Sequence, residues 1–413
     1  MRNKIIYIYI FSSFFLAQFL TLDVGPVKLS LARGSLILLL LIFILDTFKS
    51  NKIRLYKNYS YNFILLWFFY TLLNVAFGLQ YSFTGWLKLL YLVGIYSFST
   101  IIFTRYIKDL KTIEKIFYFI QIGIFIQMAI GIYEHYTGVY HWTSYAELFT
   151  THPYFQRMRY PTAMQNNPND FALLMYIGTF ISIACGRLYS NKIMKFLSYS
   201  LVIISIYLIY ISDSRSILLA LIISFIYMFV NESSIIISFI YMFVNESSIS
   251  KKNRIFLNIT LIILGIFFTY FSIDRILFFI NTKLRFSMDA GSEQVRMGHL
   301  IDAMKYLFNS FGFGIGAHGI ISWHNFWVEI LTESGIIIFI GFLVFYSKLF
   351  INMNKASNDN DNIKTSIIAK SIASILFGFV VASLGPASIL NIEWVGIIFA
   401  VFITFEKIFL EKP

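Results

Sequence analysis

Long apolar runs separated by short polar segments dominate the sequence. An α-helix rises 1.5 Å per residue, so about 20 apolar residues cross the ~30 Å hydrocarbon core of a bilayer. The runs do not alternate apolar and polar positions as the strands of a membrane barrel do. The expected helices lie near 5–22, 30–46, 61–79, 86–104, 116–133, 170–186, 197–212, 216–230, 255–272, 325–350, 366–384 and 392–407. This pattern predicts an all-α, polytopic integral membrane protein with about twelve transmembrane helices.

The composition supports the same class. Apolar residues make up 58% of the chain and charged residues only 13%, too little charge to cover a soluble surface. The first run follows Arg2 and Lys4 in the manner of a signal peptide, but no small-residue cleavage motif follows Leu20, so we expect a retained anchor. The single cysteine, Cys185, excludes an internal disulfide and a cysteine-based zinc site.

Lysine and arginine positions predict the orientation. With both termini in the cytoplasm, the basic segments 49–57, 105–115 and 251–254 all face the cytoplasm, which is the positive-inside pattern. The net charge of +12 is then a topology signal, and no nucleic-acid partner is expected. The two longest connections, 134–169 and 273–324, face outside as large external loops.

One segment is duplicated without change. Residues 222–235, IISFIYMFVNESSI, recur at 236–249. If the second copy crossed the membrane, the basic run at 251–254 would lie outside, against the positive-inside pattern. We therefore expect the second copy to prolong the preceding helix or to lie along the cytoplasmic interface. The whole chain, 1–413, is expected to form a single membrane domain.

Polar residues suited to chemistry gather in the external segments. The histidines lie in or at the edge of the two large loops: His135, His141, His152, His299, His318 and His324. The external basic residues are Arg157, Arg159, Arg215, Arg275, Lys283, Arg285, Arg296 and Lys305. The planar guanidinium of arginine suits phosphate. Arg215 stands out because its short turn, SDSRS, lies at the bilayer surface where lipid phosphates lie, although Asp213 could instead pair with it.

The last external loop carries the densest constellation of polar residues. The glycine-rich FGFGIGAHG precedes WHNFWVEILTESG, in which Asn325, Glu329 and Glu333 recur every four residues and so share one helical face. Acidic side chains in a membrane helix are unfavourable and therefore candidates for function. His324 precedes the helix, where the dipole favours the neutral imidazole that a general base requires. The alternative is a histidine that only caps the helix.

These residues resemble a known family, the bacterial O-antigen ligases and Wzy-type polysaccharide polymerases. The resemblance covers four stretches between about 159 and 345. They are RYPTAMQNNPNDFA at 159–172, SDSRS ending at Ser216, the segment Gly291–Gly316, and His324–Gly335 with its His-Asn and Glu-x-Gly pattern. The chain departs from the family at Pro161–Ala163, which lacks the glycine usual after the family's arginine.

The resemblance implies a metal-independent glycosyltransferase without cofactors. Such an enzyme acts in the bacterial cytoplasmic membrane, at its outer face, on glycans carried by undecaprenyl diphosphate. Arg215, helped by Arg296 and Arg159, would neutralise the leaving diphosphate. His324 would accept the proton of the attacking sugar hydroxyl. Further residues are expected to bind substrate or orient the acceptor: Asn325, Glu333, Asn169 and Arg285.

Several functions stay open. A polymerase of lipid-linked repeat units is favoured over a ligase because the Ile, Lys, Asn and Phe content is typical of AT-rich genomes, where such genes often belong to capsule or exopolysaccharide clusters. A ligase would move the glycan to a lipid, wall polymer or protein. A transporter of lipid-linked oligosaccharide predicts charges within the spans, whereas here they collect in external loops. A nucleotide-sugar transferase would need a pair of carboxylates that binds a cation. Asp359 and Asp361 form an Asp-x-Asp pattern, but they lie in a polar run that we interpret as a solvated cytoplasmic loop. Expected partners are the bilayer, the lipid-linked glycan and other polysaccharide-assembly proteins.

Overall fold

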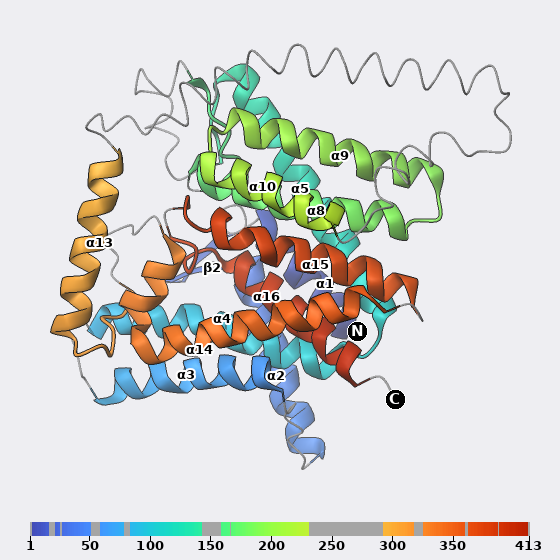
Figure 1. The fold of residues 1–413 in the computed structure, drawn as a ribbon. Helices are drawn as coiled ribbons and strands as arrows, with labels where there is room; N and C mark the ends of the chain where they lie inside the picture. The colour runs from blue at the N-terminus through green and yellow to red at the C-terminus, as the bar shows by residue number, and fades with distance from the viewer. Residues whose placement is uncertain are drawn as a thin grey trace, which may run out of the picture. The chain divides into compact units, whose positions relative to one another are not determined.

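The computed structural model describes residues 2–15, 21–24, 27–50, 58–77, 83–142, 158–165, 167–230, 292–317, 325–359, 362–386 and 388–411. Within them the chain is helical apart from one short hairpin (Figure 1). The helices are α1 Arg2–Phe15, α2 Leu31–Ser50, α3 Tyr59–Phe77, α4 Phe83–Tyr106, α5 Leu110–Thr137, α8 Pro168–Leu188, α9 Lys192–Ile211, α10 Arg215–Val230, α13 Ser292–Asn309, α14 Phe326–Ser357, α15 Ile363–Ala382 and α16 Glu393–Leu410. The strands are β1 Thr21–Val24 and β2 Val27–Ser30.

The helical membrane class is confirmed. Among the described residues, seven helices are long and apolar enough to cross a membrane, namely α2, α4, α5, α8, α9, α14 and α15. Eleven of the twelve predicted helices overlap an observed helix, and the remaining one, 255–272, lies outside the described residues. The number of twelve crossings and the orientation stay predictions.

The prediction for the first helix is wrong at its C-terminal end. Helix α1 ends at Phe15, and Thr21 opens β1, which pairs antiparallel with β2 so that Thr21 faces Ser30. The predicted helix extended to residue 22 because Thr21 and Leu22 continue the preceding run when hydropathy is the only criterion. The helix breakers Gly25 and Pro26 follow β1 directly, which suits a hairpin better than a longer helix.

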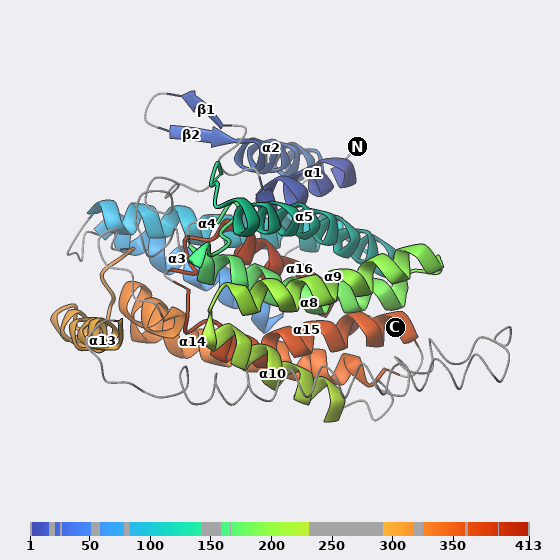
Figure 2. The same ribbon diagram turned by 90° about the horizontal axis from the view of Figure 1, so that it is seen from above.

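Two helices form the interior of the bundle. Helix α8 is buried continuously from Asp170 to Gly186, and α16 from Trp394 to Lys407. Figure 2 shows both helices among the other helices of the bundle. Helix α16 packs chiefly on α4, and α8 packs on α5, α9 and α15. Helices α2 and α9 instead expose many large apolar side chains, as helices facing lipid tails do. Because α8 and α16 are fixed in the interior, they also fix the positions of the segments that directly precede and follow them in the chain.

The chain divides into two compact units, residues 1–221 with 296–413, and residues 222–295. The second unit is described only at 222–230 and 292–295. The first copy of the duplicated segment begins within α10, and the second copy lies outside the described residues. All residues of the site below belong to the first unit.

Candidate functional site

The SDSRS turn presents an arginine at the start of a helix. Asp213, with φ of 55°, turns the chain between α9 and α10, and the carbonyl of Ser214 accepts the first helical bond from Leu218 N at 3.0 Å. Arg215 is the first residue of α10 and is exposed. Within the described residues it has no ion-pair partner, so it is not paired with the neighbouring Asp213. A cation at the positive end of a helix dipole favours an anionic ligand.

The segment 158–165 packs against this turn and against the end of α5. The hydroxyl of Tyr160 donates to Oδ2 of Asp213 at 3.2 Å. Oε2 of the buried Glu134 accepts from the backbone N–H groups of Thr162 at 2.8 Å and Ala163 at 2.7 Å. Ala163 has φ of 49°, a conformation that favours glycine. The bonds to Glu134 hold this unfavourable backbone in place.

Arg159 lies at the C-terminal end of α5. Its Nη1 donates to the carbonyl of Tyr136 at 2.9 Å, and its own carbonyl accepts from Nδ1 of His135 at 3.0 Å. Cations are favoured at this end of a helix because the last carbonyls carry partial negative charge. The guanidinium therefore stabilises α5, and among the described residues Arg159 is linked to the SDSRS turn through the adjoining Tyr160.

The Asn-Pro-Asn-Asp sequence begins α8. Asn167 caps the helix, accepting from the backbone N–H groups of Asn169 at 2.9 Å and Asp170 at 3.0 Å, and Pro168 occupies the first turn. The Asn167 amide also donates to the Asp170 carboxylate at 2.8 Å. This is the expected pattern of a helix start. Asn169, a predicted substrate-binding residue, is half-buried in the first turn.

Asn325 caps α14. Its Oδ1 accepts from the N–H groups of Trp327 at 3.0 Å and Val328 at 3.4 Å, so this oxygen satisfies the helix start. His324 directly precedes Asn325 and lies outside the described residues, as does Arg285.

Glu329 joins α14 to the loop between α15 and α16. Its buried carboxylate accepts from the hydroxyl of Ser388 and from the N–H groups of Ile389 at 3.0 Å and Leu390 at 3.3 Å. We call residues 383–386 and 388–394 the 383–394 segment. Burying a carboxylate is unfavourable unless it is hydrogen-bonded, and these three donors meet that requirement. Sequence reasoning noted Glu329 on the polar face of its helix but missed its partners.

The 383–394 segment also contacts the other stretches. A side chain at Gly385 would collide with the hydroxyl of Ser216 and lie 3.5 Å from that of Ser214. Nε1 of Trp394 donates to Oε1 of Gln165 at 3.1 Å. Thus the SDSRS turn, the 158–165 segment and the first turn of α14 all meet on a segment in which the sequence predicted no site residue.

Helix α14 breaks at Gly335, which has φ of 85° and ψ of 171°. The break leaves the carbonyls of Thr332 and Glu333 without their usual helical donors, and they accept from the N–H groups of Ile315 and Gly316, both at 3.0 Å. Non-helical backbone within a membrane protein is tolerated where its polar groups are satisfied in this way. The glycine-rich stretch is therefore the partner of the broken helix, and Glu333 is buried beside it.

Helix α13 lies within the predicted external loop 273–324 and was not predicted, since its sequence is amphipathic and not apolar. Ala303 of α13 and Ile315 are buried together, and Tyr306 and Val328 pack against them. Arg296 lies in α13 two turns before Ala303. The polar positions described above thus lie where α5, α9 and α15 end and where α8, α10, α14 and α16 begin.

These features define a helical, multi-span membrane protein with a polar site at one end of its helices, built around an open arginine. No protein-family model matches the chain. The chain is similar to the teichuronic acid biosynthesis protein TuaE of Bacillus subtilis (strain 168), with 24% identity over 355 residues, which cover 81% of this chain and 69% of the relative. The chain is a distant relative of that biosynthesis protein.

Proposed function

We propose that this protein is a glycosyltransferase of envelope polysaccharide assembly that polymerises undecaprenyl-diphosphate-linked repeat units at the outer face of the cytoplasmic membrane. The observation that carries the proposal is Arg215, an exposed arginine at the N-terminus of α10, in a turn in contact with the 158–165 and 383–394 segments. The distant similarity to a teichuronic acid biosynthesis protein supports a role in cell-wall polysaccharide synthesis.

The reaction places a negative charge where Arg215 lies. A bond forms between the anomeric carbon of the donor glycan and the acceptor hydroxyl oxygen, and the bond from that carbon to the lipid diphosphate breaks. The diphosphate leaves with additional negative charge, which the Arg215 guanidinium and the N-terminus of α10 stabilise. Arg296 is a second candidate for this role.

The acceptor hydroxyl must lose its proton. We assign this proton to His324, which directly precedes the capped start of α14. The N-terminus of a helix disfavours a positive charge and so favours the neutral imidazole that can accept a proton. In this proposal Glu333 orients the acceptor or the imidazole.

The test is a deletion strain carrying plasmid-borne variants at normal protein levels. Arg215→Ala and His324→Ala should abolish long polysaccharide, while single repeat units remain attached to their acceptor. Lys192→Ala is the matched control, because Lys192 is also an exposed cation in the first turn of a helix, at the predicted cytoplasmic side. Long polymer with Arg215→Ala would refute the proposal. Accumulation of long lipid-linked chains in the deletion strain would instead identify a ligase.

A further inference from the structure

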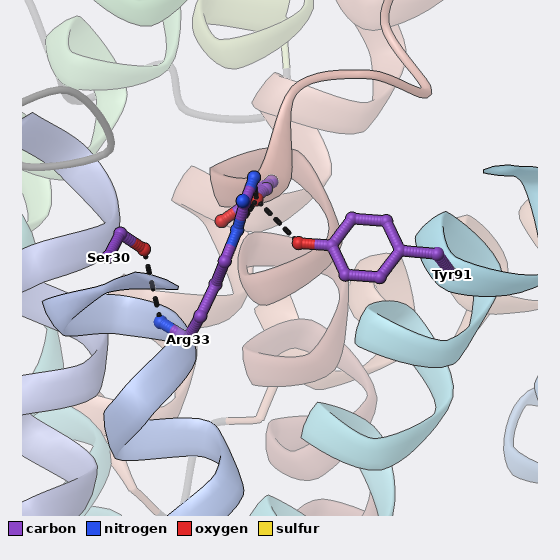
Figure 3. A network of polar contacts seen from close by, with 4 residues as sticks. Ser30, Arg33 and Tyr91 are labelled. Carbon is purple, nitrogen blue, oxygen red and sulfur yellow. Dashed lines mark hydrogen bonds and ion pairs between the residues drawn. The ribbon is translucent and has the colours of Figure 1, made fainter. Parts of the chain in front are cut away.

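Another arginine in the first turn of a helix, Arg33, lies in an arrangement that Arg215 lacks. Arg33, in the first turn of α2, donates through Nε at 2.9 Å and Nη2 at 2.6 Å to Oε1 of Glu393, at the start of α16. The hydroxyl of Tyr91 on α4 donates to the same oxygen at 3.0 Å. Ser30, at the end of β2, accepts from the backbone N–H of Arg33 at 3.2 Å and so caps α2 (Figure 3). Three helices therefore meet at one carboxylate.

The charge of this cluster suits hydroxyl groups better than phosphate. Glu393 neutralises Arg33, whereas Arg215 has no ion-pair partner within the described residues. All three donors converge on Oε1 of Glu393. Among the described residues no donor bonds Oε2, which can therefore accept from a ligand hydroxyl. The cluster lies at the surface of the described residues, since the Arg33 side chain is 32% exposed and Tyr91 is 43% exposed.

The cluster and the proposed catalytic site share the 383–394 segment. Glu393 belongs to the 383–394 segment, and the next residue, Trp394, bonds Gln165 in the segment that also contacts the SDSRS turn. With the lipid diphosphate at Arg215, a sugar farther along the same glycan would lie at this cluster. We propose that Arg33, Tyr91 and Glu393 form a subsite that binds the hydroxyl groups of a sugar ring in the glycan substrate. This inference rests on the proposed function.

The chain contains a natural control for this subsite. At the other end of the same two helices, Nη1 of Arg2 lies 3.0 Å from Oδ2 of Asp46 on α2, and the hydroxyl of Tyr106 on α4 donates to that oxygen at 2.8 Å. In each cluster the arginine also lies over the tyrosine ring, at 5.3 Å for Arg2 and 5.4 Å for Arg33. The two clusters share their chemistry, but only that of Glu393 belongs to the 383–394 segment.

The experiment compares Tyr91→Phe with Tyr106→Phe, which remove the same hydroxyl from the two clusters. Purified full-length protein in liposomes receives lipid-linked glycan extracted from the deletion strain, and chain extension is measured against glycan concentration. Tyr91→Phe should raise KM about three- to tenfold with kcat unchanged, since the hydroxyl that orients Glu393 is lost. Tyr106→Phe should leave both constants at wild-type values. Glu393→Gln should raise KM at least as much as Tyr91→Phe.

Thermal unfolding of each variant provides the folding control, and Tyr91→Phe should match Tyr106→Phe. A wild-type KM for both Tyr91→Phe and Glu393→Gln would overturn the subsite, as would equal KM changes in Tyr91→Phe and Tyr106→Phe. If the wild-type protein fails to extend the extracted glycan, the proposed function itself fails. The two failures are therefore distinguishable.

Discussion

The hydroxyl of Tyr160 donates to Oδ2 of Asp213 at 3.2 Å, and this bond joins the segment after α5 to the turn that carries Arg215. Residues 53 positions apart in the chain thereby fix the backbone of one turn. Asp213 has a positive φ, so the turn requires such external support. The turn that carries the exposed Arg215 is thus held by its neighbours in the chain and by contacts from distant segments.

Tyr160→Phe removes this bond while retaining the ring. We expect the free energy of unfolding to fall by about 0.5–1.5 kcal/mol, the usual net contribution of one hydrogen bond. A double-mutant cycle with Asp213→Ala, which removes the acceptor, followed by thermal unfolding in detergent, measures the coupling between the two side chains. Fully additive effects of the two substitutions would show that the bond does not contribute.

Ser216 and Gly385 are close enough for a disulfide. A Cβ built at Gly385 lies 3.6 Å from Cβ of Ser216, within the range that disulfides adopt. The Ser216→Cys, Gly385→Cys double variant should therefore oxidise readily, with little interference from the buried Cys185. The measurement is thiol labelling of membranes before and after oxidation.

Gly298→Cys paired with Ser216→Cys is the control for this cross-link, since a Cβ at Gly298 has no neighbour within 4 Å. It should retain two reactive thiols. If the Ser216 and Gly385 pair retained them too, the SDSRS turn would not lie against the 383–394 segment.

Glu329→Gln should destabilise the 383–394 segment. Ser388 donates to Oε1, whereas Ile389 and Leu390 donate to Oε2. Glutamine offers only one acceptor oxygen, so its amide N–H₂ would face one of these two sets of donors. A buried donor left unsatisfied costs about 1–3 kcal/mol, so we expect a loss of that size in the free energy of unfolding. Thermal unfolding and proteolysis of the segment check this result.

Glu114→Gln is the comparison for Glu329. Glu114 pairs at 3.0 Å with Lys364, whose side chain is 52% exposed. The Glu114 side chain is only 11% exposed, but the amide oxygen of glutamine can still accept from Lys364, which stays largely in contact with the surface. We therefore expect a loss of at most about 1 kcal/mol and unfolding near the wild-type temperature. Equal stability losses in the two variants would contradict the role assigned to Glu329.

Gly335→Ala should strongly destabilise the protein. Its backbone conformation is open only to glycine, and a Cβ would lie 2.5 Å from the carbonyl oxygen of Gly312. We expect a loss of at least about 2 kcal/mol and reduced abundance in membranes. Gly34→Ala, in helix α2 with no atom within 4 Å of the added Cβ, should instead gain about 0.5–1 kcal/mol. Normal abundance of Gly335→Ala would refute the break in α14.

The sequence predicted the helices well because a membrane span is a local pattern. Eleven of the predicted helices overlap observed ones, since each needs only a run of apolar residues. The same criterion missed α13, which is amphipathic, and extended the first helix across residues that form β1. The break at Gly335 was also missed, because the apolar pattern continues on its C-terminal side and nothing local signals the donors from Ile315 and Gly316.

The candidate site was predictable only in part. Arg215 was identified because its turn is short and polar between two apolar runs, and the structure presents it exposed. Arg159 and Asn325 were predicted to bind substrate. The sequence did not reveal that Arg159 bonds the end of α5 and that Asn325 caps the start of α14. The contacts of Glu329 with Ser388 and of Arg33 with Glu393 join residues 59 and 360 positions apart, which no local pattern reveals. In the sequence, only the charge of Glu393 next to the connection 385–391 could have drawn attention to it.

The central claim is that Arg215 stabilises a departing lipid diphosphate. The direct measurement is the release of undecaprenyl diphosphate from extracted lipid-linked glycan by the purified protein in liposomes, with a metal chelator present. The wild-type protein and Lys192→Ala should release it at equal rates, and Arg215→Ala should be at least about 100-fold slower, as for loss of a group that stabilises developing charge. Release by Arg215→Ala at the wild-type rate would contradict the claim.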